Sequence, residues 1–192
     1  MKFIGTKRLE TERLYLRRLT VDDAKEAFEN WCQDKDVCKY VTWDIHESLE
    51  NTKALYNLWE KEYEQPDTFR WFVVTKENNE PIGTIDVVSK KYLPYGTCEI
   101  GYCYKKSSWG KGYGTEALKR VIKFLFEKCD ADVIFAEYMT NNPGSGKVMA
   151  KSGMKYEGAV RGRILDKDGN RNDLGSYSIT KAEYFDESNH LQ

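Results

Sequence analysis

The sequence predicts a mixed α/β fold, and three observations support this prediction. The chain has 192 residues, a length that suits one domain with a sizeable core, so we expect a single domain over residues 1–192. Apolar residues make up 40% of the chain, including 13 Tyr, 8 Phe and 5 Trp, and these side chains can fill such a core. Strand-like segments alternate with segments of helical periodicity, which is typical of a sheet flanked by helices.

The first half of the chain predicts three strands and two helices. The strands are expected at residues 12–19, 69–76 and 81–91, and the helices at residues 21–31 and 47–64. In the second helix, apolar spacing predicts that Leu55, Leu58 and Trp59 share a face. The polar turn Glu-Asn-Asn-Glu at residues 77–80 separates two of the strands.

The second half predicts four strands and two helices. The strands are expected at residues 95–105, 132–140, 154–165 and 173–182, and the helices at residues 113–129 and 143–152. The first of these helices has an apolar face made of Ala117, Leu118, Val121, Ile122, Leu125 and Phe126. Asn142 is a good N-cap for the second, Pro143 suits its first turn, and Gly153 is a good stop after it. The turn at residues 166–170 is a hairpin signal, and a polar tail from Asp186 is expected to fray.

Composition excludes several classes of protein. The net charge is −1, so we expect no nucleic-acid partner; Lys105, Lys106 and Lys111 form a local basic cluster only. The N-terminus lacks the apolar stretch of a signal peptide and no segment is apolar enough to span a membrane, so a cytoplasmic protein is expected. Five Cys without C-x-x-C spacing and two His make a metal site improbable, and free thiols are expected.

The segment Ser-Ser-Trp-Gly-Lys-Gly-Tyr-Gly-Thr-Glu-Ala-Leu, residues 107–118, is the most informative part of the chain. It places three glycines at alternate positions between a predicted strand and a predicted helix. The first N–H groups of a helix have no partner inside the helix, and the helix dipole favours negative charge there. Glycines let the backbone come close to a phosphate. The segment therefore predicts an anion site.

Two other glycine-rich phosphate loops fit less well. A P-loop needs G-x-x-x-x-G-K-[ST], but Val148 stands where the hydroxyl should be and Asn141 where the first glycine should be. The dinucleotide fingerprint needs G-x-G-x-x-G after an early strand, whereas this spacing is G-x-G-x-G in the middle of the chain. Asp130 and Asp132 stand near the offset of a ribose-binding acid, so a Rossmann protein stays a minor alternative.

The glycine segment resembles the acetyl-CoA pyrophosphate loop of the GNAT superfamily of N-acetyltransferases. The family signature [QR]-x-x-G-x-[GA] appears here as Trp109-Gly-Lys-Gly112-Tyr-Gly114, and Trp109 departs from the first position. Residues 142–154 resemble the family motif N-x-x-S-x-x-[VL]-x-x-K-x-G-[FM]. Residues 12–24 are similar to the opening of the RimJ/RimL-like branch, the ribosomal-protein acetyltransferases. The resemblance runs from about residue 10 to about residue 184.

The resemblance implies a GNAT fold, a mixed and mostly antiparallel sheet of about seven strands flanked by helices. It also implies acetyl-CoA as the acyl donor and direct attack by an amine. The residues expected to bind the donor are Cys103, Tyr104, Lys105, Trp109, Gly110, Lys111, Gly112, Tyr113, Gly114, Thr115, Asn142 and Ser145. The amine must lose a proton and the thiolate must be accepted. By resemblance, Glu99 is the expected base and Ser145 the expected thiolate partner. Glu137 and Asp86 are weaker candidates for the base, and Tyr138 is an alternative acid.

The acceptor pocket is expected to use Trp43, His46, Arg70, Trp71 and Tyr177. The resemblance favours a protein N-terminal α-amine as acceptor. Two alternatives stay open: a small amine such as an aminoglycoside, polyamine or amino acid, and a catalytically silent module that binds acyl-CoA. A monomer or homodimer is expected.

Overall fold

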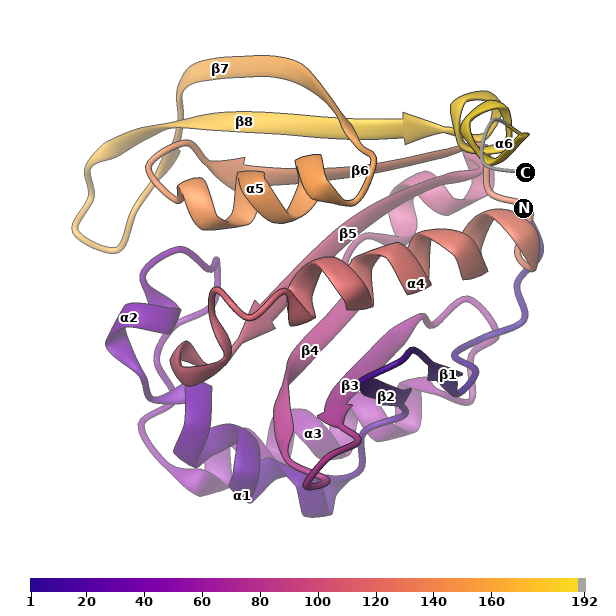
Figure 1. The fold of residues 1–192 in the computed structure, drawn as a ribbon. Helices are drawn as coiled ribbons and strands as arrows, with labels where there is room; N and C mark the ends of the chain where they lie inside the picture. The colour runs from indigo at the N-terminus through magenta and orange to yellow at the C-terminus, as the bar shows by residue number, and fades with distance from the viewer. Residues whose placement is uncertain (190–192) are drawn as a thin grey trace. The chain divides into compact units, whose positions relative to one another are not determined.

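The computed structural model describes residues 1–189, with side chains through Asp186, and forms two compact units (Figure 1). The N-terminal unit contains Phe3–Asp86 and Tyr102–Ala117. The C-terminal unit contains Met1–Lys2, Val87–Gly101 and the chain from Leu118 onward. Strand β5, Thr97–Tyr104, and helix α4, Tyr113–Glu127, each contribute residues to both units. The expectation of a single domain stays a prediction.

The N-terminal unit has an antiparallel sheet in the order β1-β2-β3-β4. These strands are Leu9–Glu10, Leu14–Arg17, Arg70–Thr75 and Pro81–Val87. Its helical segments are the 3-10 turn Val21–Asp23, α1 (Ala24–Ala27), the π-helical turn Phe28–Cys32, α2 (Lys35–Cys38), α3 (Leu49–Glu62) and the 3-10 turn Lys106–Ser108. The last three residues of β5 lie beside β4, where Lys105 N–H donates to Ile82 O at 2.9 Å.

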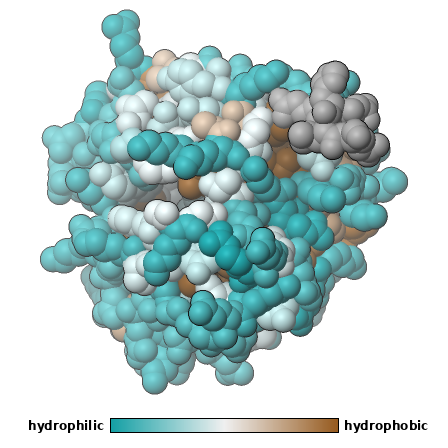
Figure 2. Space-filling model, viewed as in Figure 1, coloured by the Kyte–Doolittle hydropathy of each residue, from teal (hydrophilic) through white to brown (hydrophobic). Residues whose placement is uncertain are grey.

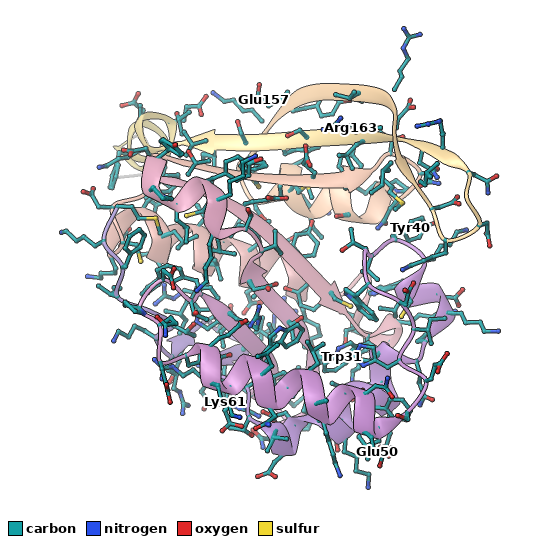
Figure 3. The ribbon with its side chains drawn as sticks, turned by 180° about the vertical axis from the view of Figure 1, so that it is seen from behind. Trp31, Tyr40, Glu50, Lys61, Glu157 and Arg163 are labelled. Carbon is teal, nitrogen blue, oxygen red and sulfur yellow. The ribbon has the colours of Figure 1, made fainter. Side chains whose placement is uncertain are left out.

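Aromatic side chains fill the core of this unit. Trp31 packs against Phe72 with ring centroids 5.7 Å apart, and Figure 3 shows Trp31 near α3, whose two ends carry Glu50 and Lys61. Helix α3 buries Tyr56 completely, whereas Leu58 is 56% exposed. The predicted face is therefore only partly buried, with Leu55 and Trp59 half-buried and Leu58 turned to solvent. The buried positions of the helix are Thr52 and Tyr56, and the ring of Tyr56 packs on Phe72 with centroids 6.4 Å apart.

The C-terminal unit combines parallel and antiparallel pairing. The start of β5 pairs in parallel with β6, which pairs antiparallel with β8, and β8 pairs antiparallel with β7. These strands are Val133–Met139 (β6), Lys155–Leu165 (β7) and Arg171–Thr180 (β8). The helical segments are the 3-10 helix Lys90–Tyr95, most of α4, α5 (Pro143–Lys151) and α6 (Lys181–Asn189). The described residues thus contain eight strands, mostly antiparallel, close to the expected seven.

Most predicted elements are confirmed within a few residues, and the exceptions have local causes. The strand expected to reach residue 91 stops at Val87, because a 3-10 helix containing Pro94 follows and ends at Gly96 with φ 71°. The helix expected at residues 21–31 is divided into 3-10, α and π turns. The tail is helical through Asn189, since Thr180 and Glu183 form a reciprocal N-terminal cap. The apolar face predicted for α4 is confirmed, with all six side chains buried.

The surface of the protein is largely polar, as its high content of charged residues predicts. The face seen in Figure 2 is mostly hydrophilic, with small scattered apolar patches. Glu157 and Arg163 extend from β7, an edge strand whose charges hinder pairing with another chain (Figure 3). Among the described residues, no helix has the length and apolarity needed to cross a membrane. The five Cys are thiols, and four of them are buried.

Candidate functional site

The glycine segment forms a turn with left-handed backbone immediately before α4. Gly110 has φ 74° and Gly112 has φ 83°, conformations that residues with a Cβ rarely adopt. A Cβ built on Gly110 would have no atom within 4 Å. The first α-helical hydrogen bond joins Glu116 N–H to Gly112 O, so the amides of the preceding residues belong to the first turn. This geometry suits a phosphate ligand.

Trp109, which departs from the family signature, has a defined role in this turn. Its Nε1–H donates to the carbonyl of Tyr104 at 2.8 Å, while 47% of its surface stays exposed. The indole therefore ties the loop to the last residue of β5. A glutamine or arginine side chain could donate the same hydrogen bond, so the departure preserves a donor at this position.

The three lysines expected to form a basic cluster differ in their surroundings. Lys105 is 4% exposed and its ammonium pairs with Glu80, and Lys106 pairs with Asp36. The hydrogen bond from Lys105 lowers the pKa of Glu80. Lys111 is exposed and lies between the two left-handed glycines. The three lysines therefore do not form the predicted basic cluster, because carboxylates neutralise two of them.

Sequence reasoning missed the partner that holds this loop. Arg13, noted only as part of an N-terminal motif, forms an ion pair with Glu116 at 2.6 Å and donates to Lys111 O at 3.1 Å. Because Arg13 and Glu116 are 103 residues apart, no local pattern could reveal the contact.

A second helix start, that of α5, carries Ser145. Asn142 caps it as predicted: its side-chain oxygen accepts from Ser145 N–H at 3.4 Å, and Pro143 occupies the first turn. Gly153 follows the helix with φ 89°, as expected of a stop residue. The half-buried Ser145 is thus the third residue of a capped helix, in a fixed backbone position.

Tyr138 on β6 is held tightly against this helix start. A Cβ on Gly146 of α5 would come within 2.9 Å of the Tyr138 ring, and a Cβ on Gly175 of β8 within 2.6 Å. The ring also packs on Tyr177 with centroids 5.9 Å apart, and Tyr177 packs on Tyr156 at 5.2 Å. Burial, followed by the other tyrosines, raises the pKa of Tyr138. The phenol therefore stays protonated and can donate a hydrogen bond.

Glu99 lies where the described β5–β6 ladder ends. It is paired with Phe135, the last of three register pairs between these strands. Alternation along the strands places Glu99, Phe135 and Glu137 on one face of the sheet and Tyr138 on the other. Burial raises the pKa of Glu99, and the nearby Glu137 carboxylate raises it further. A half-buried carboxyl with a raised pKa is suited to accept a proton near neutral pH.

Asp86 and Arg70, two other predicted site residues, are joined in an ion-pair network. They face each other in the β3–β4 ladder, and Arg70 Nε lies 3.3 Å from Asp86 Oδ2 and its Nη1 2.8 Å from Glu62 Oε2. The guanidinium also lies over the ring of Trp59, 4.2 Å from its centroid. Burial raises the pKa of Asp86 despite Arg70. Because both carboxylates are engaged by one cation, these contacts favour a structural role for Asp86 and Arg70.

The other predicted acceptor residues differ in burial: Trp43 and His46 are half-buried, whereas Trp71 is fully buried. His46 packs edge-on to Trp43 at 5.5 Å, its Nδ1 lies 2.7 Å from Thr52 Oγ1, and burial lowers its pKa, so it is neutral at pH 7. Trp71 has no exposed surface and its Nε1–H donates to Lys7 O, which assigns it to the core. Burial, with smaller contributions from other thiols, raises the pKa of Cys103, so this thiol is a poor nucleophile.

Among the described residues, no group of three or more His, Cys, Asp or Glu side chains is placed to hold a metal ion. The candidate groups for chemistry are the loop amides in the N-terminal unit and, in the C-terminal unit, the Ser145 and Tyr138 hydroxyls and the Glu99 carboxyl.

Comparison with known proteins identifies the family. A sequence model of the acetyltransferase (GNAT) domain matches residues 13–155. The uncharacterized N-acetyltransferase YoaA of Bacillus subtilis is 29% identical over 175 residues, covering 90% of this chain and 96% of YoaA. The ribosomal protein uS5-alanine N-acetyltransferase of Escherichia coli is 24% identical over 161 residues, covering 82% and 83% of the two chains.

A solved structure has the same fold. The structure of RimL, a ribosomal L7/L12 alpha-N-protein acetyltransferase in complex with coenzyme A, superposes with a TM-score of 0.80 at 15% identity and covers 91% of this chain and 98% of its own. The domain match spans most of the chain and agrees with the glycine loop and the capped Asn-x-x-Ser helix. This chain therefore belongs to the GNAT acetyltransferase family and is an N-acetyltransferase.

Proposed function

We propose that this protein transfers the acetyl group of acetyl-CoA to a protein N-terminal α-amine. The observation that carries the proposal is the loop before α4. There Gly110 and Gly112 at positive φ place backbone amides beside a helix N-terminus, and open space surrounds the position of a Gly110 Cβ. This arrangement binds phosphate, and the pyrophosphate of CoA is a ligand of that kind. Acetyl-CoA is accordingly the acyl donor.

The short β5–β6 ladder fits the same donor. In the described sheet these strands pair only over Thr97–Glu99 and Val133–Phe135, although β6 continues to Met139. Strand backbone beyond the last pair can form hydrogen bonds with an extended ligand that carries amides, as the pantetheine arm does.

Each chemical step has a candidate residue. Acetyl-CoA supplies an acetyl thioester, whose C–S bond breaks as the C–N bond to the amine forms. Glu99 takes the proton that the ammonium of the acceptor must lose, directly or through one water. Ser145, fixed by the Asn142 cap, donates a hydrogen bond to the leaving sulfur, and Tyr138 is the alternative donor. Glu137 acts on Glu99 by raising its pKa.

Amine chemistry and the relatives both support this acceptor class. An α-amine has a pKa of about 8 and a lysine amine about 10.4, so a half-buried carboxylate deprotonates the α-amine more readily. The name of the Escherichia coli relative, an alanine N-acetyltransferase for a ribosomal protein, supports the same class.

The test is a panel of acceptors incubated with acetyl-CoA, read by release of the CoA thiol. The panel contains peptides with an unmodified N-terminus and no lysine, the same peptides blocked at the N-terminus, spermidine and an aminoglycoside. We expect turnover of the unmodified peptides only. Turnover of the small amines only would contradict the proposed acceptor class, while the assignment of acetyl-CoA as donor would still hold. Calorimetry that detects no CoA binding would contradict the assignment of acetyl-CoA as donor.

A further inference from the structure

The Arg13 side chain contacts three residues of the segment that runs from the glycine loop into the first turn of α4. Its Nε donates to Glu116 Oε2 at 2.7 Å and its Nη2 lies 2.6 Å from the same oxygen. Its Nη1 donates to Lys111 O at 3.1 Å, and the guanidinium lies 4.6 Å from the ring centroid of Tyr113. The guanidinium therefore contacts the loop backbone, the first helical residue and the carboxylate one turn into α4.

The other carboxylate oxygen of Glu116 accepts hydrogen bonds from Thr11 and from the backbone of Arg13. The Arg13 N–H donates to Glu116 Oε1 at 2.9 Å, and Thr11 Oγ1 donates to it at 2.5 Å. The Glu116 side chain is 19% exposed. Burial alone would raise its pKa, but the hydrogen bonds from Thr11 and Arg13 outweigh it and the pKa is lowered. Glu116 is therefore ionised at neutral pH.

An ionised carboxylate in the first turn of α4 poses a problem for a phosphate site. The helix N-terminus favours negative charge, so Glu116 alone would compete with the pyrophosphate for the same dipole and repel it. A fork-shaped guanidinium that pairs closely with the carboxylate cancels that charge locally.

Arg13 also bears on the shape of the loop. The carbonyl that it binds, Lys111 O, lies between the two left-handed glycines, and a Cβ on Gly112 would lie 3.4 Å from Arg13 Nη2. This hydrogen bond to the carbonyl restricts the orientation of the peptide group that lies between Gly110 and Gly112. A loop that is already in its binding conformation loses less entropy when the ligand arrives.

We propose that Arg13 is a positioning residue for the acyl-donor phosphates. It fixes the Lys111 peptide and neutralises Glu116, so that the loop amides face the pyrophosphate without an opposing charge. This inference rests on the proposed function, because it assigns Arg13 to the same donor site.

The experiment compares CoA affinity by calorimetry with steady-state kinetics in five variants of the full chain: Arg13→Met, Arg13→Lys, Glu116→Gln, Arg13→Met with Glu116→Gln, and Arg8→Met. Arg8 is the matched control, because it pairs with Glu10 at 3.3 Å and lies 4.5 Å from the ring centroid of Tyr15 in the same unit. Melting temperatures report whether each variant folds.

The proposal predicts an asymmetric result. Arg13→Met should weaken CoA binding by about tenfold or more and raise KM for acetyl-CoA, with kcat at saturating donor changed by less than about twofold. Arg13→Lys should recover part of the affinity, since a lysine keeps the charge and loses the fork. Glu116→Gln should bind CoA as tightly as the wild type or more tightly, and the double variant should bind better than Arg13→Met.

Other results would overturn the inference. If Glu116→Gln and Arg13→Met weaken CoA equally, the pair is only a structural clasp between distant segments. Equal CoA affinity of folded Arg13→Met and Arg8→Met would remove Arg13 from the donor site while the proposed function stands. If the wild-type protein binds no CoA, the proposed function and this inference fail together.

Discussion

The two helix starts, α4 and α5, are similar in sequence and different in structure. Each follows a strand and has glycines in or before its first turn. At α5, the Asn142 side chain accepts from the Ser145 N–H, and Gly146 packs on Tyr138. At α4, the glycines adopt φ 74° and 83°, and open space surrounds Gly110. One start supplies its own cap and the other presents backbone amides.

The comparison shows that glycines at a helix start do not by themselves leave its amides open to a ligand. The α5 start has no acidic residue in its first turn and satisfies an amide with a neutral side chain, so what it presents is the Ser145 hydroxyl. The α4 start carries Glu116 and needs Arg13, from 103 residues away, to cancel it. We therefore expect mutations at α5 to change turnover and mutations at α4 to change donor affinity.

Ser145→Ala should give the largest effect on turnover. Loss of a group that stabilises the leaving thiolate should lower kcat by roughly 10–10³-fold, with little change in CoA affinity. Steady-state kinetics with a verified acceptor would measure the first and calorimetry the second. Ser152→Ala is a matched control, since that hydroxyl donates to Val148 O at the other end of α5. An unchanged kcat in Ser145→Ala would reduce Ser145 to part of the helix start.

Glu99→Gln should depress activity by about 10²-fold at neutral pH, the scale of a general base. The loss should shrink as pH rises toward the pKa of the amine, and it should shrink sooner for an α-amine than for a lysine acceptor. Glu99 must be ionised to act, and its raised pKa moves the acid limb of the rate profile upward. A mutant profile that overlays the wild type would leave Glu99 without a catalytic role.

Glu137→Gln sharpens the same test. Removing the Glu137 charge should lower the pKa of Glu99, so the acid limb should move to lower pH while the plateau stays unchanged. An acid limb that does not move would show that the two carboxyls are not coupled in solution.

Gly112→Val should weaken CoA binding by about 10–100-fold, because in the proposed site a branched side chain would push the loop backbone away from the phosphates. Gly169→Val is the control for strain alone, since Gly169 has φ 79° in the β7–β8 turn and a Cβ there would meet nothing within 4 Å. Both variants should lose similar stability, and only Gly112→Val should lose affinity. Equal CoA affinity in the two folded variants would remove the loop from the donor site.

Features that depend on residues close together in the sequence were predicted well, whereas contacts between residues far apart in the sequence could not be predicted. The cap at Asn142, the stop at Gly153 and the apolar face of α4 depend on residues a few positions apart, so spacing alone revealed them. Tyr56 on α3 is buried and Leu58 is not, and this depends on Phe72, a packing partner on strand β3. The contact of Arg13 with Glu116 has the same character.

The smallest expected effect, that of Asn142→Ala, tests the α5 half of the comparison directly. Removing a side-chain N-cap should cost about 1 kcal/mol of stability. It should also free the start of α5, and because Ser145 N–H is the group that Asn142 caps, kcat should fall by a few-fold while CoA affinity changes less. Denaturant unfolding gives the first number and steady-state kinetics the second. Asn142→Asp is the control, because aspartate keeps the capping oxygen and should retain the stability. If Asn142→Ala instead weakened CoA as strongly as Gly112→Val, the α5 start would be a second phosphate-binding element, and the contrast between a self-capped and an open helix start would not hold.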